Sequence, residues 1–201
     1  MTQIIALAAE PRDRAGKGTA RATRREGRLP AVIYGNKEKP VMISLDANAF
    51  WKILNKPGFF THLYDITVNG AAHRVLARDV QLDPVTDRPL HADFLRVSDT
   101  TELTVKIPVE FIGADKSPGL KKGGVLNIVR HEIELVCKAN DIPEKIVIDL
   151  ETANLNESIH ISAVKLPEGV RPTITDRDFT VATIAAPSGL KSEAAGEAAG
   201  A

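Results

Sequence analysis

Short apolar runs recur through the first half of the chain, separated by clusters of glycine, proline and charged residues. This spacing is typical of β-strands, because long helices would show a period near 3.6 residues instead. Asn69-Gly70 separates two of the runs and predicts a type I′ hairpin turn, since both residues tolerate positive φ angles. The expected strands are Ile4–Ala9, Ala31–Tyr34, Val41–Leu45, His62–Val68, Ala71–Val80 and Leu90–Val97. Six short strands of this kind predict a small barrel or sandwich.

Two helical segments are expected among these strands. Asp46 is a suitable N-cap for a helix that runs to about Asn55. Three apolar residues of this helix fall at positions i, i+3 and i+4 and would form one buried face: Phe50, Ile53 and Leu54. Ala20 to Arg25 predict a shorter helical turn that ends before Gly27.

The second half of the chain is also predicted to be β-rich. A clean alternation begins after residues 98–101 and places five apolar residues on one face of a strand: Leu103, Val105, Ile107, Val109 and Phe111. Pro108 interrupts the other face and lacks an amide hydrogen, so we expect an edge strand or a bulge. Cys137 occupies an apolar position of a later strand and is predicted to lie in the core. The fold class is therefore mainly β, with domains at 1–97 and 98–187 and a disordered tail at 188–201.

Composition places the protein in a reducing compartment. Apolar residues make up 43% of the 201 residues, which is enough to build real cores. The single cysteine excludes an internal disulfide. The N-terminus lacks the basic segment of a signal peptide, and no apolar stretch approaches the ~20 residues that cross a membrane. We therefore expect a cytoplasmic protein with no membrane partner.

Charge divides the chain, although its net charge is zero. Residues 1–96 hold 15 Lys and Arg against 10 Asp and Glu, whereas residues 97–201 hold 11 against 16. Such asymmetry suggests two domains with different partners. The alternative is that the two halves simply attract each other.

The basic excess is concentrated in one segment. Seven basic residues lie within 17 positions, interleaved with glycines: Arg12, Arg14, Lys17, Arg21, Arg24, Arg25 and Arg28. Arginine forks suit phosphate oxygens, and glycines let a backbone come close to them. If the helical turn forms, Arg21, Arg24 and Arg25 share one face that could follow a phosphate ridge. The alternative is a solvated charged loop. The segment holds six arginines and one lysine, and this excess of arginine favours RNA binding.

Polar residues on the last predicted strand could add selectivity. Alternation directs Leu90, Ala92 and Phe94 to the core, so His91 and Asp93 share the exposed face. A carboxylate on an RNA-binding face costs affinity unless it accepts from a 2′-hydroxyl or an amino group. The other histidines show no spacing typical of metal ligands, so neither a metal nor another cofactor is expected.

Several motifs occur together in one order: Gly16-Lys17-Gly18 with the arginine run, Leu29-Pro30-Ala31-Val32-Ile33-Tyr34-Gly35, Asp79-Val80-Gln81 and His91-Ala92-Asp93-Phe94. In order and spacing they resemble the bacterial large-subunit ribosomal protein L twenty-five (Ctc, general stress protein) family, in its long two-domain form. The resemblance implies an N-terminal six-stranded β-barrel that binds 5S ribosomal RNA, and a second, β-rich domain.

The resemblance also implies where the RNA contacts lie and what the protein does. The implied contact residues are Arg12, Lys17, Arg21, Arg24, Tyr34, Gln81, His91 and Asp93. Arg78 joins them as a prediction from its place before Asp79-Val80-Gln81 on the same strand. The implied role is that of a non-enzymatic component of the large subunit, a monomer without a small-molecule substrate. Its further partners would be neighbouring ribosomal proteins or 23S ribosomal RNA.

Three other functions are compatible with parts of the pattern. The first is a transfer-RNA-binding module, which a chain without a catalytic domain makes less favourable. The second is a stress-related RNA-binding protein that acts off the ribosome, which the sequence does not separate from a ribosomal role. The third is a hydrolase that uses His91 and Asp93, for which no further residue supplies a nucleophile.

Overall fold

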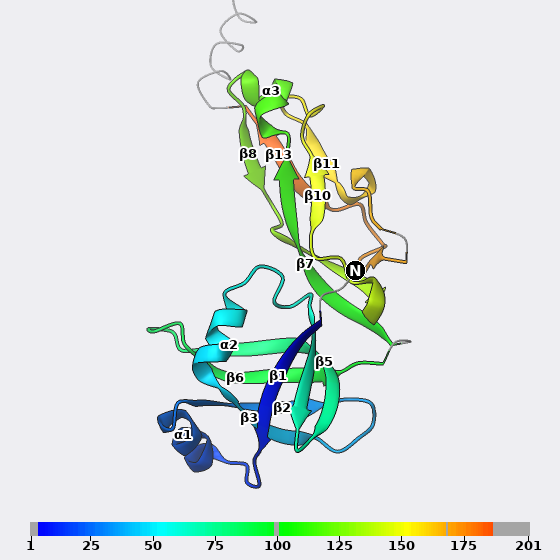
Figure 1. Cartoon of the computed structure of the whole chain (residues 1–201). Coiled ribbons are helices and arrows are strands. Elements are labelled where there is room, and N and C mark those ends of the chain that lie inside the picture. The colour runs from blue at the N-terminus through cyan, green and yellow to red at the C-terminus, as the bar shows by residue number, and fades with distance from the viewer. Residues whose placement is uncertain (1–3, 99–100, 168, 187–201) are drawn as a thin grey trace, which may run out of the picture. The chain divides into compact units, whose positions relative to one another are not determined.

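A closed β-barrel forms the N-terminal part of the computed structural model, which describes residues 4–98, 101–167 and 169–186 (Figure 1). Its strands are β1 (Ile4–Pro11), β2 (Arg28–Tyr34), β3 (Val41–Asp46), β4 (Leu63–Val68), β5 (Ala71–Leu82) and β6 (Pro89–Arg96). They pair in the order β1-β3-β2-β6-β5-β4, and β1 closes the ring against β4. The sequence predicted a barrel or a sandwich, and the structure is the barrel.

The six strands enclose an apolar core. Alternate positions on β2 and β6 point inward, so that Ala31, Ile33, Ala92 and Phe94 are almost completely buried. Aromatic rings fill the interior, and the Phe50 ring lies edge-on to Phe94 with centroids 6.3 Å apart. The outward-pointing Val32, Tyr34, His91 and Asp93 of the same strands are only half-buried.

Both helices expected in this domain are present. The helix α1 (Lys17–Arg25) begins three residues before the predicted Ala20. The helix α2 (Ala47–Leu54) begins after Asp46, whose Oδ1 accepts a hydrogen bond from the Ala49 amide at 2.7 Å. The predicted N-cap is therefore confirmed.

The β4–β5 hairpin has the predicted turn, with φ angles of 49° at Asn69 and 82° at Gly70. On the other side of β5, the pairing with β6 shifts between Ala77 and Asp79. Arg78 is the extra residue of this bulge, and a bulge redirects the side chains that follow it. The alternation of β5 alone did not reveal it.

The rest of the described chain is also β-rich and contains two sheets. The first has the order β10-β7-β9-β12 and the second β11-β13-β8. Their strands are β7 (Glu102–Ile112), β8 (Val125–Ile128), β9 (Glu132–Lys138), β10 (Ile146–Asp149), β11 (Ser158–His160), β12 (Arg171–Pro172) and β13 (Thr180–Ala185). Short helical turns connect them: η1 (Ala114–Lys116), α3 (Pro118–Lys121), η2 (Ala139–Asp141) and η3 (Ile161–Ala163).

One expectation for β7 is wrong. We predicted an edge strand or a bulge because of Pro108, and the edge position is contradicted because β7 lies between β10 and β9. The paired positions of β7 and β10 begin with Val109 and Ile146, one residue after the proline. The missing amide hydrogen of Pro108 thus lies just before that ladder. Cys137 is buried, as predicted.

The structure contains two compact units, and the barrel lies within the first. Residues 188–201, the predicted tail, lie outside the described residues, as do residues 99–100 of the predicted boundary. None of the helices in the described part of the chain has the length and apolar character needed to cross a bilayer.

Candidate nucleic-acid interface

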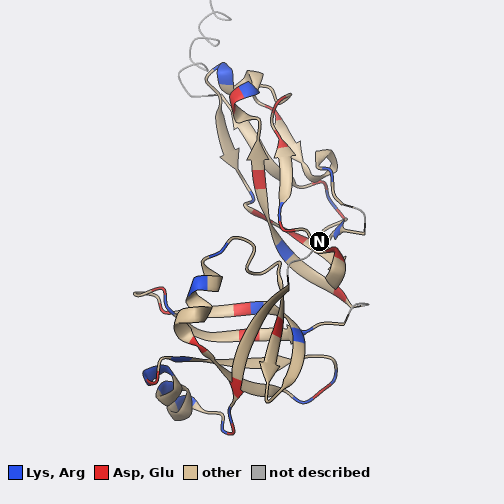
Figure 2. Ribbon diagram, viewed as in Figure 1, with Lys and Arg blue, Asp and Glu red and all other residues tan. Residues whose placement is uncertain are grey.

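The helix α1 presents a concentrated positive charge. It has no buried residue and packs on the barrel beside β2. Lys17, Arg21 and Arg25 are exposed on it, and Figure 2 shows the basic positions gathered along this helix. The helix therefore contributes little to the core, and its side chains are available to phosphate oxygens.

Arg24 connects this helix to β6. Its Nη1 donates a hydrogen bond to the Leu90 carbonyl oxygen at 3.0 Å. Leu90 is the residue before His91, so the basic helix and the polar side of β6 are neighbours on the barrel surface. Arg24 is half-buried, and it has a structural role in addition to any contact with RNA.

The guanidinium of Arg28, the last basic residue of the run, is bonded to other residues of the protein. Its guanidinium forms an ion pair with Glu10 at 3.0 Å. The same group donates to the hydroxyl and the carbonyl oxygen of Ser44, both at 3.0 Å. Arg28 therefore ties β1, β2 and β3 together, and it contributes less free charge than the sequence suggested.

A row of outward-pointing residues crosses the barrel surface. The Arg12 amide donates to the Met42 carbonyl oxygen at 2.9 Å, and Met42 pairs with Val32. Val32 pairs in turn with Asp93, and Asp93 pairs with Asp79. Arg12 and Asp93, far apart in sequence, thus lie in one row on the outer side of the sheet. The Nη2 of Arg12 is buried and has no hydrogen-bond partner among the described residues.

Beside this row, His91 and Asp93 form a close pair. The His91 Nδ1 and the Asp93 Oδ1 are 2.7 Å apart, and both side chains are partly exposed. Gln81 is the cross-strand partner of His91 on β5 and is exposed. The predicted sharing of one face by His91 and Asp93 is therefore observed, with hydrogen-bonding groups directed outward.

Tyr34 lies next to this polar group, at the end of β2. Burial raises the pKa of its hydroxyl, and the charges of Asp93 and Asp79 raise it further, while Arg78 acts in the opposite direction. The hydroxyl thus stays a neutral donor throughout the physiological range. These electrostatic influences also show that Arg78, Asp79, Asp93 and Tyr34 occupy one neighbourhood. Arg78 itself is exposed and donates to the Thr104 carbonyl oxygen at 2.9 Å.

The geometry offers little to a hydrolytic reaction. No hydroxyl or thiol of the described residues hydrogen bonds to His91, so the pair with Asp93 has no adjacent nucleophile there. Within the described ranges, no group of three or more His, Cys, Asp or Glu could hold a metal ion.

Comparisons with known proteins match both halves of the chain. The model of the Ribosomal L25p family matches residues 7–94, and that of the ribosomal protein TL5 C-terminal domain matches residues 102–188. Two relatives named large ribosomal subunit protein bL25 match nearly the whole chain. The one from Rhodospirillum rubrum is 57% identical over 100% of this chain and 97% of its own length. The one from Novosphingobium aromaticivorans is 60% identical over 96% of this chain and 95% of its own length.

The chain belongs to the bL25 family. The predicted membership in its two-domain form is thereby confirmed, because both family models match in order along the chain. The positions of the domain limits, at residues 97 and 187, stay predictions.

Every residue predicted to contact RNA lies in the barrel domain of this bL25 family member, and all but Arg12 lie on α1, β2, β5 or β6. Arg12 is the exception in position, since it follows β1 directly. The sequence did not single out Asp79, Trp51 or Arg88 as site residues. Asp79 faces outward only because the bulge at Arg78 displaces it, and nothing in the local pattern announces that.

Proposed function

We propose that the chain is a structural, non-catalytic component of the bacterial large ribosomal subunit and binds 5S ribosomal RNA through its barrel. The names of the relatives support the ribosomal role. The observation that carries the RNA-binding part is the hydrogen bond from Arg24 to Leu90, which holds the arginine-rich helix next to the polar side of β6.

Helix α1 and the polar outer side of β2, β5 and β6 have different roles in this proposal. Arginine and lysine side chains of α1 neutralise phosphates and supply most of the affinity, without sequence preference. The polar groups on β2, β5 and β6 read base edges and 2′-hydroxyls in the wide, shallow minor groove of an RNA helix. The proposed contact set is Arg12, Lys17, Arg21, Arg24, Tyr34, Arg78, Gln81, His91 and Asp93.

A rigid barrel suits this kind of recognition. Side chains cannot read the deep major groove of an A-form helix, so shape and 2′-hydroxyl contacts carry the selectivity. The closed ring of strands fixes the spacing of His91, Asp93 and Tyr34 before RNA arrives, which lowers the entropy lost on binding. The protein acts as a monomer in the cytoplasm, and neighbouring ribosomal proteins or 23S ribosomal RNA contact its second domain.

Capture of ribosomes by the full chain tests the ribosomal role. Tagged protein is incubated with bacterial lysate at moderate salt, and the RNA in the eluate is sequenced. We expect intact large subunits with 5S ribosomal RNA in equal amount to 23S ribosomal RNA. Enrichment of transfer RNA without ribosomal RNA would contradict the proposal and favour a transfer-RNA-binding module instead.

A further inference from the structure

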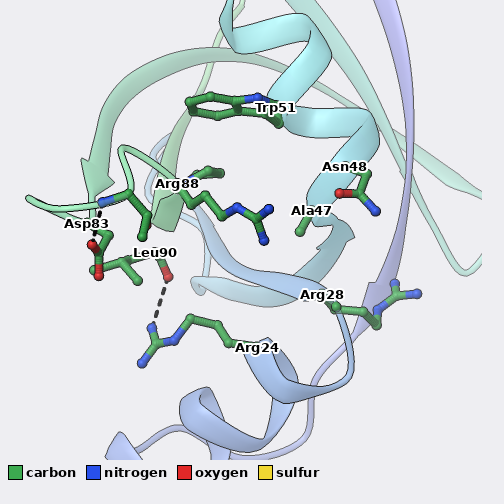
Figure 3. A pocket seen from close by; sticks show the side chains of 11 residues that line it. Arg24, Arg28, Ala47, Asn48, Trp51, Asp83, Arg88 and Leu90 are labelled. Carbon is green, nitrogen blue, oxygen red and sulfur yellow. Dashed lines mark hydrogen bonds between the residues drawn. The ribbon is translucent and has the colours of Figure 1, made fainter.

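A pocket of about 380 Å³ opens on the barrel surface beside α1 (Figure 3). Helix α1, helix α2 and the loop between β5 and β6 surround it. Its principal side chains are Arg24, Arg28, Trp51, Asp83, Arg88 and Leu90. The volume lies at the lower end of the range of small-ligand sites, ~300–1,000 Å³. None of the contacts proposed so far uses Trp51 or Arg88.

We propose that this pocket receives one unpaired nucleotide of the bound RNA, with its base stacked on Trp51 and its phosphate held by Arg88. The inference rests on the proposed function, because it assumes that RNA lies on the adjacent face. It adds a single-nucleotide site to a surface otherwise suited to paired RNA.

Trp51 supplies the stacking surface. It lies on α2, next to Phe50, which is completely buried in the barrel core. Trp51 is only partly buried and lines the pocket instead, at the side opposite Arg24 in Figure 3. Unpaired bases stack on aromatic side chains without strong sequence preference, because every base has a π-face.

The arginines of the pocket differ in how many ion pairs and hydrogen bonds they form within the protein. Arg28 is committed to Glu10 and Ser44, and Arg24 uses one nitrogen on Leu90. Arg88 forms no ion pair or side-chain hydrogen bond with any described residue, although it is exposed at the pocket edge. Figure 3 shows its guanidinium between Trp51 and Arg24. An unpaired guanidinium at this place suits a phosphate oxygen.

Asp83 adds a contact to the base edge. Its Oδ1 accepts from the amides of Val85 and Thr86, at 3.0 and 2.9 Å, and these bonds lower the pKa of the carboxyl. The loop therefore holds an ionised acceptor at the pocket wall. Such a group accepts hydrogen bonds from amino or imino groups of a base and repels a second phosphate.

The pocket is continuous with the proposed RNA-binding face. Leu90 lines it and also accepts the hydrogen bond from Arg24, and the next residue on β6 is His91. An RNA strand that contacts His91 can therefore place a neighbouring nucleotide in the pocket without crossing the barrel.

Fluorescence of the full chain tests this directly, because Trp51 is its only tryptophan. The protein is titrated with 5S ribosomal RNA while a gel-shift assay measures binding independently. We expect quenching of Trp51 that follows the binding curve. Binding without quenching would overturn the nucleotide pocket and leave the proposed function intact. Absence of binding in the gel shift would overturn both.

Variants separate stacking from structural effects. Trp51→Ala is expected to weaken binding of 5S ribosomal RNA by about five-fold or more, while Trp51→Phe keeps a ring and stays within about two-fold of the unmodified protein. Arg88→Ala should weaken binding and reduce its salt dependence. Melting temperatures confirm that each variant is folded. Equal binding by Trp51→Ala and the unmodified protein would overturn the inference.

A second titration identifies the source of the nucleotide. AMP is added to the protein alone and to the complex with 5S ribosomal RNA. We expect weak quenching by AMP alone and none in the complex, where the pocket is filled. Quenching by AMP that bound RNA does not block would overturn RNA as the source of the nucleotide.

Discussion

The Nδ1 of His91 lies 2.7 Å from the Oδ1 of Asp93, and both side chains project from the outer side of β6. In a neutral imidazole, the nitrogen next to the carboxylate carries the hydrogen and donates it. The other ring nitrogen of such an imidazole is then an acceptor. Asp93 thus orients His91, and in the proposed function the two residues act as one preorganised hydrogen-bonding unit toward an RNA minor groove.

This pairing predicts a loss of selectivity in Asp93→Asn. The amide no longer fixes the imidazole tautomer, while removal of a negative charge favours non-specific attraction to phosphates. We expect the ratio of transfer RNA to 5S ribosomal RNA dissociation constants to fall by roughly ten-fold, about 1.4 kcal/mol. Competition gel shifts measure it. Asp115→Asn removes the same charge outside the barrel and should leave the ratio unchanged; an unchanged ratio in Asp93→Asn would remove Asp93 from the contact set.

The arginines of α1 are expected to act through counterion release. Arg21→Ala and Arg24→Ala should each weaken binding of 5S ribosomal RNA and reduce the slope of log K against log salt by about one unit. Only Arg24→Ala should also lower the melting temperature, because it loses the hydrogen bond to Leu90.

Lys121→Ala with Lys122→Ala is the matched control, since it removes two exposed positive charges from the second half of the chain. Its salt slope should equal that of the unmodified protein. If the slope falls there as much as in Arg21→Ala, the affinity comes from net charge and not from α1.

Strands β6 and β5 show which structural features the sequence predicts and which it does not. Alternation along β6 is a local property, and it correctly placed His91 opposite to Ala92 and Phe94. It was wrong for Leu90, which it also directed to the core, because Leu90 is only half-buried and lines the surface pocket. The bulge at Arg78 depends on how β5 pairs with β6, and the inner position of β7 depends on which strands become its neighbours. Pairing partners are set by long-range packing, so a single sequence did not reveal them.

The pocket beside α1 shows the same limit. Trp51 and Arg88 are 37 positions apart, on α2 and on the loop between β5 and β6. Neither belongs to a motif with fixed spacing, and barrel closure brings them together. By contrast, the N-cap Asp46 and the Asn69-Gly70 turn depend on neighbours a few residues away, and both were predicted.

Gly35 is expected to be sensitive to substitution. Its φ angle is 110°, and a Cβ atom there would lie 2.9 Å from Leu95 Cδ1 and 3.3 Å from the Arg96 amide nitrogen. We predict that Gly35→Ala lowers the free energy of unfolding by about 1–3 kcal/mol and disturbs the adjacent Tyr34. Urea denaturation measures the change.

Gly18→Ala is the natural comparison for that variant. Gly18 lies within α1, and a Cβ atom there would meet nothing within 4 Å. Alanine is the better helix former, so this variant should be as stable as the unmodified protein or slightly more so. A larger loss of stability in Gly18→Ala than in Gly35→Ala would contradict the packing argument.

Cys137 should resist alkylation in the folded protein. Burial raises the pKa of its thiol to about 11, with Asp141 acting in the same direction. At pH 8 fewer than about one thiol in a hundred is then ionised, and the thiolate is the reactive form. We predict little reaction with iodoacetamide in buffer and complete reaction in denaturant, followed by mass spectrometry. Rapid labelling in buffer would show that the core around Cys137 opens readily.

The affinity of the full chain for 5S ribosomal RNA, measured against a transfer RNA at fixed moderate salt, tests the central claim most directly. The geometry of the barrel surface predicts a preference for 5S ribosomal RNA of about a hundred-fold or more, about 2.7 kcal/mol. It also predicts a salt slope that falls when Arg21 is replaced. Equal affinity for the two RNAs would contradict the account, because the charge of α1 would then be the whole basis of binding.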